Sequence, residues 1–142
     1  SKGAILGLTF ATDKATLAKA ILEGLTFELR LNLDLLKESG VRIDELRAIG
    51  GGARSELWLQ LKADITGMPV VVPRITEAAS WGAALLAGQG AGHFASAAGA
   101  AEAMLRLERT IEPDPEQSAR YEERFSLYRE VYPTLRGIHH RI

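Results

Sequence analysis

At 142 residues, the chain has the length of about one domain, and its formal net charge of -1, from 17 basic and 18 acidic side chains, gives no global attraction for a nucleic acid or an anionic membrane. The absence of cysteine excludes disulfides and thiolate metal sites, and a content of 46% apolar residues is enough for a hydrophobic core. The apolar runs are too short to cross a bilayer and we find no signal-peptide layout, so we expect a cytoplasmic protein.

The first predicted element is a long helix that follows residues 3–9, an apolar stretch typical of a strand or a loop. Four apolar residues at intervals of four positions indicate the helix: Leu17, Ile21, Leu25 and Leu29. Thr12 or Asp13 can cap its start, and the helix should end near Glu38, with Gly40 just beyond.

Two short strands are predicted on either side of a second helix. Residues 46–49 are mostly apolar, and residues 68–72 contain three valines and are bounded by prolines, as is typical of strands. The helix between them is indicated by Leu57, Leu61 and Ile65 and should stop at Gly67. Because a helix joins them, we expect the two strands to be parallel members of an α/β layer.

The remainder of the chain is predicted to be helical. Thr76 should cap a third helix of small residues that suits close packing, and Ser96 should cap a fourth one that runs to about Leu107. After a break at residues 112–115, a last helix carries an aromatic stripe that we interpret as packed core: Tyr121, Phe125, Tyr128 and Tyr132. Two or three strands are few for so many helices, so we expect an incomplete part of a larger domain.

Residues 50–55, Gly-Gly-Gly-Ala-Arg-Ser, connect the first predicted strand to the second predicted helix. Three glycines permit positive φ and remove side chains, so a flat or charged ligand can approach backbone N–H groups at the positive end of a helix. Glycines at this place also make plain tight turns, and the residues alone leave both interpretations open. The two common phosphate-binding fingerprints are excluded, because no Lys follows the glycines and Ser55 stands where the last glycine of a dinucleotide motif belongs.

The chain resembles the C-terminal part of FGGY-family carbohydrate kinases, and most of all their xylulokinase-type (xylulose kinase) members. The similarity is carried by residues 7–9, 23–24, 50–70, 77, 82–84, 109–115 and 128–129. It implies a ribonuclease-H-like α/β domain of the actin and hexokinase type, incomplete, with few parallel strands and several helices. Residues 1–142 would then be the C-terminal portion of the nucleotide-binding domain, and the N-terminal sugar-binding domain would be absent.

The resemblance also implies a function for the intact parent protein, which is the transfer of a phosphoryl group from ATP with Mg²⁺ to a sugar hydroxyl. The expected reaction converts D-xylulose to xylulose 5-phosphate. The residues expected on the adenosine side of the cleft are Gly51, Gly52, Ala53, Arg54 and Ser55. Gly50 is expected to be a turn element, and Arg54 is expected to be solvated more readily than bound to phosphate.

The catalytic Asp, the phosphate loops and the sugar-binding residues of the family lie upstream, so the resemblance assigns no catalytic residue to this chain and implies that the chain alone is inactive. A second hypothesis is a non-catalytic nucleotide-binding or oligomerisation module of the same fold. We expect ATP and a small sugar as partners, rather than a nucleic acid or a membrane, and we expect that exposed apolar surface can support a homo-oligomer.

The remaining polar and aromatic candidates are given structural roles. The carboxylates of Asp64 and Glu77 are expected to serve in caps, surface charge or structural hydrogen bonds rather than as a catalytic pair. The histidines lack a third metal ligand or a nearby nucleophile; they are His93, His139 and His140. Trp58 and Trp81 are expected to pack rather than to stack on adenine.

Overall fold

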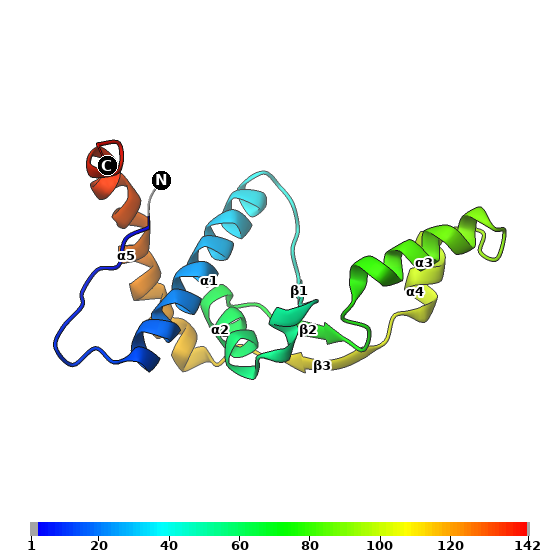
Figure 1. Cartoon of the computed structure of the whole chain (residues 1–142), viewed down its shortest axis with the longest axis horizontal. Helices are drawn as coiled ribbons and strands as arrows, with labels where there is room; N and C mark the ends of the chain where they lie inside the picture. The colour runs from blue at the N-terminus through cyan, green and yellow to red at the C-terminus, as the bar shows by residue number, and fades with distance from the viewer. Residues whose placement is uncertain (1–2, 142) are drawn as a thin grey trace.

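The structure is a computed structural model that describes residues 3–141. In chain order its elements are α1 (Lys14–Glu38), β1 (Leu46–Arg47), a 3₁₀ turn (Gly51–Arg54), α2 (Glu56–Thr66), β2 (Val70–Pro73), α3 (Ala78–Gly90), α4 (Ala97–Met104), β3 (Leu107–Ile111) and α5 (Pro115–His139). Figure 1 shows α1 and α5 on one side of α2 and the small sheet on the other, with α3 and α4 projecting away from the sheet as a pair.

The described residues form a three-stranded sheet in the order β1-β2-β3. Strand β1 pairs with β2 in parallel, with Leu46 opposite Val70, which confirms the predicted parallel pair. Strand β3 pairs with β2 in the antiparallel sense, with Ile111 opposite Val70, and was not predicted. The sheet is therefore mixed rather than all parallel.

The predicted end of the fourth helix, near Leu107, is wrong. Helix α4 ends at Met104, and Leu105 already has the extended angles φ -58° and ψ 127°. The guanidinium of Arg106 donates hydrogen bonds to the carbonyls of Ala103 and Leu105, so it satisfies backbone acceptors where the helix stops. Residues 107–111 continue as strand β3, in which the β-branched side chains of Thr110 and Ile111 suit an extended backbone.

Helix α2 lies between two hydrophobic clusters. The cluster toward the sheet contains Ala48, Ala53, Leu59, Ala63, Val70 and Val72. The cluster toward α1 and α5 contains Phe27, Leu61, Ile65, Tyr121 and Phe125. Of the three residues whose spacing indicated this helix, Leu61 and Ile65 are buried and Leu57 is exposed. Because α2 packs on two sides, it buries residues that lie outside a single apolar stripe. Each fully buried Leu or Ile side chain stabilises the fold by about 2 kcal/mol.

Helix α1 begins and ends as predicted, but it packs through a different face. Asp13 caps it, with Oδ1 accepting a 2.7 Å hydrogen bond from the Thr16 N–H, and Gly40 follows it with φ 89°. The residues buried on α1 are Thr26, Phe27 and Leu33. Ile21 and Leu25, from the predicted stripe, instead line an open apolar groove of about 600 Å³ between α1, α5 and residues 3–6. Residues 3–9 form a loop rather than a strand.

The start of α3 also differs from its prediction. Glu77, not Thr76, occupies the N-cap position, and no side chain caps the helix. The Thr76 carbonyl instead accepts hydrogen bonds from the Ala78 N–H and from the Gly50 N–H, both at 2.9 Å. The connection between β2 and α3 is therefore tied to the start of the glycine motif.

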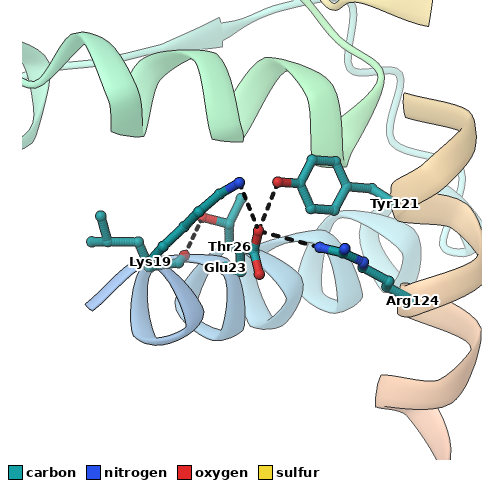
Figure 2. Close-up of polar contacts among 6 residues, drawn as sticks. Lys19, Glu23, Thr26, Tyr121 and Arg124 are labelled. Carbon is teal, nitrogen blue, oxygen red and sulfur yellow. Dashed lines mark hydrogen bonds and ion pairs between the residues drawn. The ribbon is translucent and has the colours of Figure 1, made fainter. Parts of the chain in front are cut away.

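Helix α5 packs on α1 through the predicted aromatic stripe. Tyr121 and Phe125 are buried and Tyr128 is partly buried, but Tyr132 is 51% exposed, so the interpretation as core is wrong for that residue. Figure 2 shows how polar groups complete this contact: the Glu23 carboxylate of α1 faces Tyr121 and Arg124 of α5. None of the helices in the described range, 3–141, is long and apolar enough to cross a membrane.

Candidate functional site

The glycine motif forms the 3₁₀ turn between β1 and α2. Gly50 has φ 67° and ψ -160°, a region that only glycine populates readily, which confirms its prediction as a turn element. The turn is closed by a 3.1 Å hydrogen bond from the Ala53 N–H to the Gly50 carbonyl. Ser55 caps α2, because its Oγ accepts a 3.3 Å hydrogen bond from the Trp58 N–H. The motif thus delivers the chain directly to the positive end of α2.

Gly51 and Gly52 have different surroundings. A Cβ placed on Gly51 would meet no atom within 4 Å, so the backbone there faces open space. A Cβ on Gly52 would lie 3.3 Å from the Trp58 ring and 3.6 Å from Lys62 Nζ. The missing side chain of Gly52 is therefore explained by packing against α2, whereas Gly51 leaves room for a ligand.

Trp58 and Lys62 support the turn from α2. The Trp58 indole N–H donates to Thr26 Oγ1 at 3.3 Å, and the Lys62 ammonium lies 4.4 Å from the centre of the Trp58 ring, over its face. Burial lowers the pKa of Lys62. The predicted packing role of Trp58 is confirmed, because its ring packs against the cluster around Phe27 and Leu61.

Ala53 and Arg54 point to opposite environments. Ala53 is buried in the cluster toward the sheet, so only its backbone can serve a ligand. The Arg54 side chain is 76% exposed, and its Nη2 lies 3.5 Å from Oε1 of the exposed Glu77. Glu77, at the start of α3, is thereby brought next to the motif as the partner of a guanidinium.

Arg109 on β3 completes the site and was not identified from the sequence as a site residue. Its guanidinium pairs with Glu56 and donates a 3.1 Å hydrogen bond from Nη2 to the Ala53 carbonyl. The extended pattern of residues 107–111 could have indicated the strand. The contact itself has no local signal, because 56 positions separate Arg109 from Ala53.

Asp64 has the structural role that was predicted for it. Its side chain is buried, and Oδ1 accepts hydrogen bonds from the Asp114 N–H at 2.9 Å and from Gln60 Nε2 at 2.8 Å. Asp64 therefore ties α2 to the start of α5, while Glu77 pairs with Arg54 instead of with Asp64.

The other predicted candidates lie apart from the motif. Trp81 lines a pocket of about 230 Å³ at the base of α3 and α4, together with Arg74 and Met104. His93 follows the end of α3, with its N–H bonded to the Gly88 carbonyl, and His139 and His140 stand at the end of α5. Within residues 3–141, no group of three or more His, Cys, Asp or Glu side chains could hold a metal ion.

The arrangement can bind a flat or anionic molecule but offers no obvious base. The motif offers hydrogen-bond donors of several kinds: the backbone at Gly51, which faces open space, the Ser55 hydroxyl, the exposed Arg54 guanidinium and the positive end of α2. The nearby carboxylates of Glu56 and Glu77 are both engaged with guanidinium groups.

Comparison with known proteins gives consistent matches along the chain. A family model for the FGGY family of carbohydrate kinases, C-terminal domain, matches residues 1–91. Xylulose kinase of Staphylococcus epidermidis is 34% identical over 131 residues, which are 92% of this chain and 26% of that protein. Glycerol kinase of Geobacter sp. strain M21 is 44% identical over 126 residues, 86% of this chain and 24% of that protein. Autoinducer-2 kinase of Escherichia coli is 37% identical over 127 residues, which are 89% of this chain and 24% of that protein.

Solved structures agree with these relatives. Xylulose kinase from Rhodospirillum rubrum superposes with a TM-score of 0.82 at 27% identity, covering 99% of this chain and 28% of that chain. Plasmodium falciparum glycerol kinase with ADP gives a TM-score of 0.70 at 25% identity, covering 89% and 26%. The chain therefore spans about a quarter of the length of the proteins that it matches.

Proposed function

Because the chain belongs to the FGGY family of carbohydrate kinases, with part of their actin- and hexokinase-like fold, we propose that it is the C-terminal portion of the nucleotide-binding domain of an ATP-dependent sugar kinase. The coverage of about a quarter of each relative supports a longer parent protein. The parent, in the cytoplasm, transfers the γ-phosphoryl group of ATP to a sugar hydroxyl.

The glycine motif contributes the adenosine side of the cleft, through Gly51, Gly52, Ala53, Arg54 and Ser55. One observation carries this proposal: the turn made by Gly50 presents the Gly51 backbone to open space at the positive end of α2. Within the motif, Gly51 makes the closest approach to the nucleotide. Ser55 donates from its hydroxyl while its oxygen stays in the helix cap.

The residues of this chain fit the nucleoside better than they fit the metal. A Mg²⁺ ion needs oxygen ligands, and no suitable cluster of side chains exists among residues 3–141. Mg²⁺ therefore accompanies the ATP phosphates, where it neutralises charge during transfer. The proton acceptor and the sugar-binding residues belong to the rest of the parent protein.

D-Xylulose is the proposed sugar, with xylulose 5-phosphate as product. Support comes from the xylulose kinases among the relatives and among the solved structures. Glycerol is the second candidate, because a glycerol kinase has the higher identity of 44% over a similar length. Specificity residues lie outside this segment in our proposal, so similar segments can serve kinases of different substrates.

A coupled ADP-release assay on the parent protein that carries this chain tests the function. We expect turnover with D-xylulose well above that with glycerol and above a control without sugar. Absence of turnover with every sugar and polyol assayed, D-xylulose and glycerol included, would contradict the proposal that the parent protein is a sugar kinase. The 142-residue chain alone should show no turnover and only weak ATP binding, because it provides one wall of the site; submicromolar affinity would contradict that view.

A further inference from the structure

Both backbone groups of Ala53 are anchored, and the two anchors come from different places. Its N–H bonds to the Gly50 carbonyl within the turn, at 3.1 Å. Its carbonyl accepts from Arg109 Nη2, at 3.1 Å, from strand β3 on the sheet. A third bond, from the Gly50 N–H to the Thr76 carbonyl, fixes the beginning of the turn. Gly51 and Gly52 therefore lie between two residues, Gly50 and Ala53, whose backbones are held by hydrogen bonds.

The second contact of the Arg109 guanidinium keeps it in place. It pairs with Glu56, in the first turn of α2, where a carboxylate is favoured by the helix dipole and a guanidinium is not. Glu56 therefore compensates the positive charge of Arg109 at this end of the helix. The planar guanidinium has separate nitrogens for the carboxylate and for the Ala53 carbonyl, which the single ammonium of a lysine cannot reproduce.

The contribution of Arg109 to stability is expected to be small. Its partner Glu56 is 71% exposed, and exposed ion pairs of this kind stabilise by at most about 1 kcal/mol. In addition, Arg109 Nε makes no hydrogen bond to another described residue, so it adds no further bond to the fold. Neither observation explains an arginine at this position, whereas the hydrogen bond from Arg109 to the Ala53 carbonyl does.

We propose that Arg109 is a positioning residue for nucleotide binding: by holding the Ala53 carbonyl, it fixes the direction of the exposed Gly51 backbone. The inference rests on the proposed function, since it assigns nucleotide contact to that backbone. Arg109 touches the loop and not the nucleotide. Removing its guanidinium loosens the turn and weakens nucleotide affinity while the fold persists.

The first test needs no ligand. Amide hydrogen exchange, followed by NMR in the 142-residue chain, compares the wild type with Arg109→Gln. We expect exchange at Ala53 and its neighbours in the turn to accelerate by about tenfold, as expected for loss of a charge-assisted hydrogen bond. Arg120→Gln is the matched control, because Arg120 makes an i,i+4 pair with Glu116 on α5. Unchanged exchange in Arg109→Gln overturns the proposal.

The second test measures affinity for ADP by NMR titration of the same variants. In Arg109→Gln we expect an affinity weaker by about three- to tenfold, the effect of losing about one hydrogen bond. Arg109→Lys should recover part of this affinity, and Arg120→Gln should leave it unchanged. Equal affinity of the wild type and Arg109→Gln overturns the positioning role. A wild-type chain that shows no ADP binding counts against the proposed function instead, and loop exchange then decides the role of Arg109.

Circular dichroism establishes whether each variant folds. Should Arg109→Gln fail to fold, Glu56→Gln supplies the same comparison, since it frees the guanidinium from its carboxylate without changing β3. Its exchange at Ala53 is expected to rise, though less than in Arg109→Gln. An unaltered turn in Glu56→Gln would overturn the proposed coupling between Glu56, Arg109 and the loop.

Discussion

The Tyr121 hydroxyl on α5 donates a 2.7 Å hydrogen bond to the Glu23 carboxylate on α1 (Figure 2). The same carboxylate oxygen lies 3.6 Å from Lys19 Nζ and 3.5 Å from Arg124 Nη1, and its side chain is only 14% exposed. This bond joins two residues that lie 98 positions apart in the sequence, and it connects α1 to α5 beside the aromatic pair of Phe27 and Phe125.

The first prediction is an alkaline loss of stability that depends on Tyr121. Burial and the hydrogen bond to Glu23 raise the pKa of Tyr121 above its ordinary value of 10.0. The folded state thus keeps a proton that the unfolded state loses, so this stabilisation is complete below the unfolded pKa and declines as pH rises above it. Tyr121→Phe should be less stable than the wild type by about 1–3 kcal/mol near neutral pH, and the difference should shrink above about pH 10.

Urea unfolding at about pH 8 and about pH 11 measures this difference. Tyr132→Phe is the control, because its ring is half exposed. A pH dependence in Tyr121→Phe that matches the wild type and Tyr132→Phe would show that Tyr121 does not carry the alkaline effect.

The second prediction separates two glycines by backbone conformation. Gly50→Ala should destabilise the chain by about 1–3 kcal/mol, because φ 67° with ψ -160° is strained for any residue with a Cβ. Gly82→Ala should instead be neutral or stabilise α3 by up to about 1 kcal/mol, since Gly82 is helical and a Cβ meets no atom within 4 Å. Thermal unfolding of both variants measures this difference. Equal changes in the melting temperature of Gly50→Ala and Gly82→Ala would refute the conformational explanation.

The third prediction distinguishes ligand approach from packing inside the motif. Gly51→Ala should leave the melting temperature nearly unchanged and weaken ADP binding, because its new methyl group points into open space that the nucleotide would use. Gly52→Ala places a methyl group 3.3 Å from the Trp58 ring, so it should destabilise the fold by about 1 kcal/mol. If Gly51→Ala binds ADP as the wild type does, the nucleotide does not approach at Gly51.

Local chemistry predicted the ends of several elements correctly. Asp13 and Ser96 cap their helices, and Gly67, with φ 66°, ends α2, because short side-chain oxygens and glycine satisfy needs that arise within a few residues. The parallel pairing of β1 and β2 followed from the helix between them. Such features depend on neighbours in sequence, which a single sequence displays.

Features that depend on distant segments were missed or misplaced. The high helix propensity of the alanine-rich stretch before Met104 led to a predicted helix end near Leu107, although the β-branched Thr110 and Ile111 favour a strand. Ile21 and Leu25 follow a helical period, yet it is Phe27 of α1 that packs against α2 and α5, while Ile21 and Leu25 line the open groove. Arg109 reached the candidate site only because β3 pairs with β2, which places position 109 beside the glycine turn.

The fourth prediction concerns Asp64, whose buried Oδ1 holds the Asp114 N–H at the start of α5. Asp64→Ala leaves that N–H without its acceptor and removes one of the two acceptors of the Gln60 amide, so it should lower the free energy of unfolding by about 1–3 kcal/mol. Asp64→Asn keeps one side-chain oxygen and should lose less. Asp44→Asn is the control, since Asp44 lies on the surface in a pair with Arg42.

Kinetics of the parent protein complete this test of Asp64. A residue that only joins α2 to α5 should leave kcat within about threefold of the wild type in Asp64→Asn at temperatures well below unfolding, because no interaction specific to the transition state is removed. A catalytic carboxylate would behave differently, since replacing a general base lowers the rate by about 10²- to 10⁴-fold. A loss of that size in a stably folded Asp64→Asn enzyme would overturn the structural role, and a normal kcat with a lowered melting temperature would support it.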